Sequence, residues 1–113
     1  MFRKKPAQVA MNQSSNPPGF PSRTEMLVSR ARRAQQRGER RQALVALREA
    51  ALLAESDPKL WALYGSACVK GNRLEEAERA FGQALYLRQR QHDTGRANTL
   101  RSLIARLGFG RAA

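Results

Sequence analysis

Several residue types on which catalysis and metal binding often depend are scarce in this sequence of 113 residues. Its one cysteine, Cys68, excludes an internal disulfide and a metal site built from several cysteines, and it fits a reducing cytoplasm. Its one histidine, His92, precedes Asp93, and because adjacent side chains diverge we do not expect this pair to act in catalysis. The phosphate-loop, CxxC and HExxH motifs are also missing. We therefore expect neither an enzyme nor a cofactor or metal site.

Long apolar runs and acidic residues are scarce as well. No apolar stretch approaches the roughly 18 residues of a membrane span, so we expect no transmembrane segment and a cytoplasmic protein. The 9 acidic residues stand against 21 basic ones, and the formal net charge is +12. This excess favours an acidic partner, which would be a protein, a nucleic acid or an anionic lipid. A high arginine content beside abundant alanine and glycine is also typical of a GC-rich genome, and this alternative stays open.

The N-terminal segment, residues 1–21, is predicted to be a disordered tail. Its prolines deny helical hydrogen bonds, and its central residues are polar without periodicity. A basic cluster at its start could anchor the tail on a polyanion or a membrane surface, although a solvated tail is the simpler interpretation. The prolines are Pro6, Pro17, Pro18 and Pro21, and the basic cluster is Arg3, Lys4 and Lys5.

The folded part is expected to begin at Ser22. Ser22 and Glu25 have the spacing of a capping box, in which each side chain satisfies a free backbone donor of the first helical turn. The first helix is predicted to run to about Arg37, and Gly38 supplies the left-handed residue that ends it. A second helix is predicted over residues 39–54.

The third helix is predicted to start at Asp57 and Pro58. Asp caps a helix well, and proline suits the first helical position because its missing N–H has no intrahelical partner there. The helix is expected to run to Lys70 and to end at Gly71. Its helical spacing places Cys68 inward, as a small buried residue.

The fourth helix is predicted over residues 73–90. Asn72 is expected to cap it, with Glu75 three residues later in a near capping box. Glu75, Glu76 and Glu78 form a carboxylate cluster near its start, which the favourable interaction with the helix macrodipole explains. A metal or acid–base site would need more partners than these.

The last helix is predicted over residues 96–107, after a cap at Asp93 or Thr94, and Gly108 is expected to close it. Residues 109–113 would then be a frayed end. The helix carries an apolar stripe and a polar outer face, so we expect it to pack on the fourth helix as a cap. The alternative is that the stripe docks a second copy or another protein. The stripe is Leu100, Leu103, Ile104 and Leu107, and the outer face is Arg96, Arg101 and Arg106.

Residues 60–87 carry an aromatic residue, a small residue one turn later, and a small, aromatic, small series on the next helix. They are Trp61, Gly65, Ala77, Phe81 and Ala84. Residues of the same size classes precede them at a fixed offset of 34, namely Leu27, Ala31, Ala43, Leu47 and Ala50. Only Gly71 is one residue out of step with Gly38, so the two turns are expected to differ slightly. This pattern resembles the tetratricopeptide repeat.

The resemblance implies an all-α domain over residues 22–108. It would contain two tetratricopeptide-like hairpins, residues 22–56 and 57–91, followed by a capping helix over 93–107. Such hairpins stack into a right-handed solenoid, and about three units are usually needed to bury the apolar faces. The extra helix would therefore complete the stack.

In the resembled family the first helix of each hairpin lines a concave groove that holds a peptide or a partner helix. The resemblance thus implies a protein–protein interaction module, such as a small adaptor, an assembly factor or a dedicated chaperone. The mixture of apolar and basic groove residues suits an acidic, apolar segment. The groove residues are expected to be Val28, Arg32, Gln35, Gln36, Ala62, Ser66, Val69 and Lys70.

Arginines cluster around the first turn between helices and give an alternative function. They could bind phosphates, as in a nucleic-acid accessory protein. Against this, no exposed aromatic residue is expected among them to stack on bases. An ordinary solvated helix face is the simpler interpretation. The arginines are Arg30, Arg33, Arg37, Arg40 and Arg41.

Overall fold

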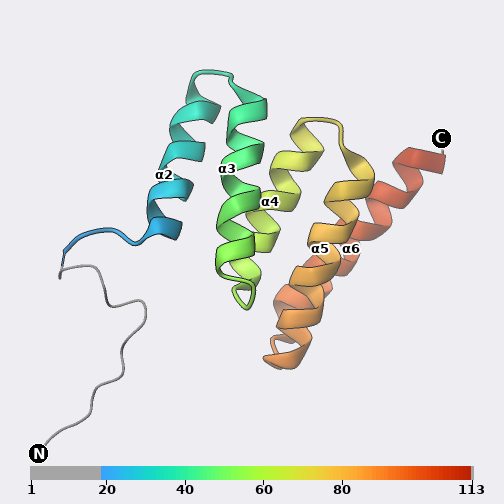
Figure 1. Cartoon of the computed structure of the whole chain (residues 1–113). Coiled ribbons are helices and arrows are strands. Elements are labelled where there is room, and N and C mark those ends of the chain that lie inside the picture. Colours follow the sequence, from blue (N-terminus) through green and yellow to red (C-terminus); the bar gives the residue numbers. More distant parts are fainter. Residues whose placement is uncertain (1–18, 113) are drawn as a thin grey trace, which may run out of the picture.

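The computed structural model describes residues 19–112, and this range contains five helices and no strand. The all-α prediction is therefore confirmed for the described residues. Residues 1–18 of the predicted tail lie outside the described range, and they include Arg3, Lys4 and Lys5. The helices, shown in Figure 1, are α2 (Arg23–Gln36), α3 (Arg40–Leu53), α4 (Pro58–Lys70), α5 (Leu74–Arg90) and α6 (Thr94–Ala112).

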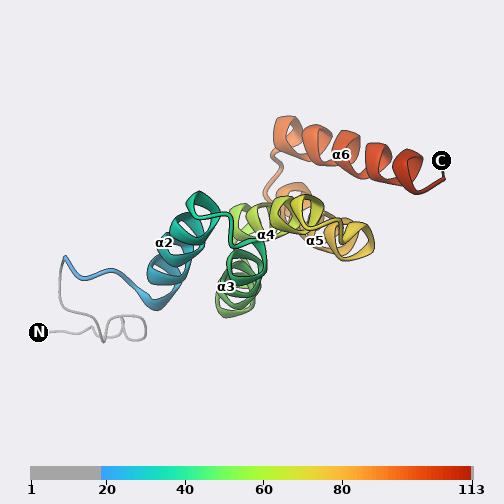
Figure 2. The same ribbon diagram turned by 90° about the horizontal axis from the view of Figure 1, so that it is seen from above.

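The helices stack in chain order as antiparallel neighbours (Figures 1 and 2). α2 packs against α3, α3 against α4, α4 against α5, and α5 against α6. No other pair of the described helices is in close backbone contact. Close backbone contacts among the described helices thus join only chain neighbours, which is the local packing of a stack.

The predicted starts of the first and third helices are confirmed. The Ser22 side chain accepts a hydrogen bond from the backbone N–H of Glu25, and the Glu25 carboxylate accepts one from the backbone N–H of Ser22. Asp57 accepts a hydrogen bond from the backbone N–H of Lys59 at 3.0 Å, with Pro58 at the first helical position. These caps satisfy donors that the helix itself leaves free.

Alanine dominates the core, which allows the helix axes to approach closely. Gly65 of α4 packs closely against Phe81 of α5. A Cβ atom on Gly65 would lie 2.7 Å from two carbons of the Phe81 ring. Trp61 is only partly buried; its Nε1 donates a hydrogen bond to the Glu55 carbonyl at 2.8 Å and so ties α4 to the preceding turn.

Three turns share one backbone geometry. Gly38, Asn72 and His92 have positive φ values of 76°, 60° and 59° and follow α2, α4 and α5. At each turn the residue after the left-handed one donates its backbone N–H to a carbonyl five residues earlier, at 2.8 to 2.9 Å. This is the Schellman arrangement, which satisfies carbonyls at a helix end. His92 is therefore a turn residue.

The turn between α4 and α5 corrects the sequence analysis. Asn72 does not cap α5, because it takes the left-handed conformation itself, and Arg73 is the N-cap without a side-chain hydrogen bond. Gly71 has a φ of −88° and does not need to be glycine for its backbone angle. Asn72 lies 34 residues after Gly38, so the two turns match in geometry, contrary to expectation. Asparagine tolerates the left-handed region better than most residues.

The last helix also differs from its prediction, since α6 continues through Gly108 to Ala112. Gly108 has no positive φ and lies inside the helix, so it does not close α6 as expected. Asp93 rather than Thr94 provides the cap, because it accepts a hydrogen bond from the backbone N–H of Arg96 at 3.1 Å. Residues 109–112 are thus helical, not a separate end.

α6 packs its apolar stripe on α5, as expected. Ala97 and Leu100 are buried, whereas the stripe residues further along α6 remain partly exposed. The first part of α6 therefore covers α5, and the later part leaves apolar surface accessible. The partly exposed residues are Leu103, Ile104 and Leu107.

Candidate functional site

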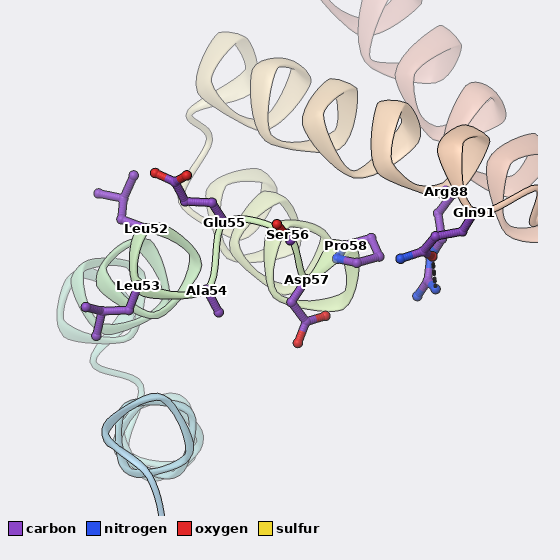
Figure 3. A pocket seen from close by; sticks show the side chains of 9 residues that line it. All are labelled: Leu52, Leu53, Ala54, Glu55, Ser56, Asp57, Pro58, Arg88 and Gln91. Atoms are coloured by element: carbon purple, nitrogen blue, oxygen red, sulfur yellow. Dashed lines mark hydrogen bonds between the residues drawn. The ribbon is translucent and has the colours of Figure 1, made fainter. Parts of the chain in front are cut away.

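A wide depression of about 850 Å³ lies where the α3–α4 turn faces the end of α5 (Figure 3). In Figure 3, Leu52 and Leu53 lie on one side of the turn, while Arg88 and Gln91 lie on the other. Arg88 donates a hydrogen bond to the Gln91 side chain at 3.3 Å. A ligand site would require polar groups that converge on one point. The side chains here point outward and do not converge.

A smaller depression of about 390 Å³ lies between α4 and α6, with α5 beneath it, and we call it the α4–α6 groove. Phe81 of α5 contributes to its lining and is only 2% exposed. One wall comes from the second half of α4 and the other from the later part of α6. The wall residues are Ser66, Val69 and Lys70 from α4, and Leu103, Arg106 and Leu107 from α6.

The chemistry of the α4–α6 groove is apolar with two cations. Val69 is 39% exposed, and Leu103 and Leu107 are partly exposed beside it. Lys70 and Arg106 are exposed, and neither forms an ion pair with a carboxylate of the described residues. A ligand that buries apolar side chains here would meet unpaired positive charge next to them.

The structure brings together only part of the predicted groove. Ser66, Val69 and Lys70 line the α4–α6 groove, but its opposite wall is α6 and not α2. Ala62 and Val28 pack against the core as partly buried residues. The other predicted groove residues are exposed on α2, namely Arg32, Gln35 and Gln36. α2 has no close backbone contact with α4.

The predicted arginine patch is divided by the structure. Arg30 and Arg33 are exposed on α2, and Arg37 pairs with Glu39 at 2.9 Å. Arg40 and Arg41 instead line a depression of about 560 Å³ between the start of α3 and the α4–α5 turn. We call this the basic pocket, and its lining is Arg40, Arg41, Leu44, Val45, Arg48, Lys70, Gly71, Asn72 and Arg73.

A polar network joins three helices beside the basic pocket. Arg48 of α3 donates to the Glu76 carboxylate of α5 at 2.7 Å and to the Tyr64 hydroxyl of α4 at 3.2 Å. Tyr64 also hydrogen-bonds to Glu76, and Arg73 contacts the second Glu76 oxygen at 2.7 Å. Glu76 lies in the first turn of α5, where the helix macrodipole favours it as expected, and it also forms ion pairs that the sequence did not predict.

The network sets the charge states of its members. Burial raises the pKa of Glu76, but the hydrogen bonds from Tyr64, Arg48 and Arg73 outweigh it and lower the pKa to about 2. Burial and the bond to Glu76 raise the pKa of Tyr64. The hydrogen bonds of Arg48 to Glu76 and Tyr64 raise the pKa of Arg48. Glu76 is therefore ionised and Tyr64 neutral at pH 7.

The remaining single residues have structural surroundings. Cys68 is fully buried, as predicted, and burial raises the pKa of its thiol to about 11, so the nucleophilic thiolate is rare at neutral pH. Among residues 19–112, no group of three or more His, Cys, Asp or Glu residues is arranged to hold a metal ion. No helix of this range combines the length and apolar character that crossing a bilayer requires.

Comparison with known proteins gives no match: no family model, no curated protein and no solved structure is significantly similar to this chain. The fold and its surfaces define the class as an all-helical protein of stacked antiparallel hairpins.

Proposed function

We propose that this chain is a tetratricopeptide-like repeat protein that acts as a protein–protein interaction module. In this proposal α2–α3 and α4–α5 are two repeats of a right-handed solenoid fragment, and α6 completes the stack. The module would serve as a small adaptor, an assembly factor or a dedicated chaperone. Its ligand is a short segment or partner helix with apolar side chains next to carboxylates.

The α4–α6 groove is the single observation that supports this proposal most. Its apolar residues Val69, Leu103 and Leu107 remain accessible in the folded chain. Exposed apolar surface beside a depression is typical of sites that bind another protein. Lys70 and Arg106 lack carboxylate partners among the described residues, so acidic groups of a ligand would complement them.

Peptide display on the full chain tests the proposal, followed by fluorescence polarisation of the selected peptides. We expect peptides that combine apolar residues with Asp or Glu. Val69→Asp should weaken their binding by about tenfold, because it places a charge in the apolar wall and repels the ligand's carboxylates. Amide shifts of Ser66 and Leu103 in NMR spectra would locate the bound peptide.

Met26→Asp is the matched control. Met26 is 48% exposed on α2, outside the α4–α6 groove, and the substitution introduces the same charge. We expect it to change affinity by less than about twofold. Equal losses for Val69→Asp and Met26→Asp, or selected peptides without acidic residues, would contradict the proposal.

A further inference from the structure

The basic pocket concentrates positive charge that the carboxylates of the described residues neutralise only in part. Five of its lining residues are cationic and none is acidic. Two of the cations, Arg48 and Arg73, are paired with Glu76. The other three form no ion pair with a carboxylate of the described residues, and they are Arg40, Arg41 and Lys70.

The location of Arg40 and Arg41 is electrostatically unfavourable without a ligand. Both lie in the first turn of α3, where the positive end of the helix macrodipole disfavours cations. The N-cap residue Glu39 makes no side-chain hydrogen bond to the helix, and its carboxylate is bound to Arg37. By contrast, the first turn of α5 carries two acidic residues. An anion in the basic pocket would relieve this repulsion.

Other parts of the basic pocket are already held in place. Glu76 binds Arg48 at 2.7 Å and Arg73 at 2.7 Å, which restrains both guanidinium groups before any ligand arrives. Guanidinium groups match phosphate oxygens with paired N–H donors. Such preorganisation lowers the entropic cost of binding.

We propose that the basic pocket binds a compact ligand that carries two or more adjacent phosphate groups. This inference goes beyond the proposed function and does not depend on it. A volume of about 560 Å³ is within the range of small-molecule sites. The cations converge on one hollow, whereas Arg30 and Arg33 lie on α2 outside it, so the arrangement favours a compact anion over a long nucleic-acid strand.

Titration calorimetry of the full chain with inorganic tripolyphosphate tests this inference. The double substitution Arg40→Gln/Arg41→Gln should weaken binding by at least about tenfold, since it removes two of the three unpaired cations. The control is Arg30→Gln/Arg33→Gln, which lowers the net charge equally outside the basic pocket and should cost less than about twofold. Equal losses for the two double variants would overturn the proposal, because they would indicate non-specific attraction.

Further measurements locate the site and separate the sources of phosphate. Amide shifts of Gly71 and Asn72 on adding tripolyphosphate would place the ligand in the basic pocket, and their absence would contradict the proposal. Adenosine triphosphate as a second probe distinguishes a nucleotide from a free oligophosphate. A 20-base-pair DNA duplex that binds regardless of Arg40→Gln/Arg41→Gln, with no binding of either small probe, would refute the compact ligand.

The two proposed sites can fail separately. Val69→Ala removes apolar surface from the α4–α6 groove without adding a charge beside Lys70, and it should leave tripolyphosphate binding unchanged within about twofold. Conversely, Arg40→Gln/Arg41→Gln should leave binding of a groove-selected peptide unchanged. Lys70 lines both the groove and the basic pocket, so its substitution would not distinguish them.

Discussion

The two hairpins, α2–α3 and α4–α5, share the geometry of their turns although different residues occupy it. The second helix of each begins at corresponding positions, Arg40 and Leu74, which are 34 residues apart. Both hairpins turn through a Schellman arrangement with a left-handed residue at Gly38 or Asn72. Glycine in one turn and asparagine in the other thus take the same left-handed conformation.

The residues that pack inside each hairpin also differ between the two hairpins. In α4–α5, Gly65 and Phe81 pack against each other, and Gly65 leaves no room for a Cβ atom. The residues at the corresponding positions of α2–α3 are Ala31 and Leu47, and both are buried. A small and a large residue thus meet in one hairpin, while two residues of intermediate size occupy the other. Close packing makes such positions sensitive to one methyl group.

Gly65→Ala is expected to have the largest effect of the substitutions compared between the hairpins. Although alanine favours helix, the new methyl would press on the buried Phe81 ring, and we expect a net loss of about 3 kcal/mol in unfolding free energy. Adding Phe81→Leu should restore part of this loss, because it recreates the pairing of the first hairpin. Urea unfolding of the two variants measures both effects. If Phe81→Leu does not restore stability to Gly65→Ala, the steric clash with the Phe81 ring is not the cause of the loss.

A second difference is electrostatic and concerns the starts of α3 and α5. α3 begins with Arg40 and Arg41, whereas α5 has Glu75 and Glu76 in its first turn. Arg48 of the first hairpin binds Glu76, so the acidic first turn of α5 is tied to α3. The network therefore links the two hairpins through Arg48 and also joins α4 to α5 within the second hairpin through Tyr64.

Glu76→Gln should lower the unfolding free energy at pH 7 by about 2 kcal/mol, since it leaves Arg48 and Tyr64 without their ionised partner. The pKa of Glu76 is about 2, below its ordinary 4.5, so the ionised form favours folding. This stabilisation is fully present above pH 4.5 and is lost as pH falls through 2. The parent chain should therefore lose more stability than Glu76→Gln between pH 5 and 2.

Glu75→Gln provides the control, because Glu75 is exposed in the same turn. Denaturant unfolding at several pH values follows all three proteins. Glu75→Gln should retain the parental loss of stability at low pH. If Glu76→Gln also retains it, the network does not contribute to acid sensitivity.

The comparison also indicates which features the sequence could reveal. Ser22, Asp57 and Pro58 have local capping roles, and the structure confirms the helix starts that they predict. Asn72 was assigned wrongly because asparagine favours both helix caps and left-handed turns, and sequence spacing alone did not separate them. The local sequence of one helix does not show which side chains of another helix it contacts. The Arg48–Tyr64–Glu76 network and the α6 wall of the groove therefore needed the structure.

The smallest expected effect concerns the left-handed residues inside the two hairpins, Gly38 and Asn72. Their φ values are 76° and 60°, and a Cβ atom at Gly38 would meet nothing within 4 Å. Gly38→Ala should thus cost about 1 kcal/mol from backbone strain alone, without a packing penalty. Gly38→Asn should cost roughly half as much, since asparagine is tolerated in this region.

The reciprocal substitution, Asn72→Gly, should change the unfolding free energy by no more than about 0.5 kcal/mol, because relief of strain offsets the greater freedom of glycine in the unfolded chain. Thermal and urea unfolding would rank the three variants. Because Gly38 and Asn72 lie at equivalent turns, alanine at either position should be worse than asparagine or glycine. A tolerated Gly38→Ala would mean that the α2–α3 turn does not depend on its left-handed residue, and the geometric equivalence of the two hairpins would not extend to their energetics.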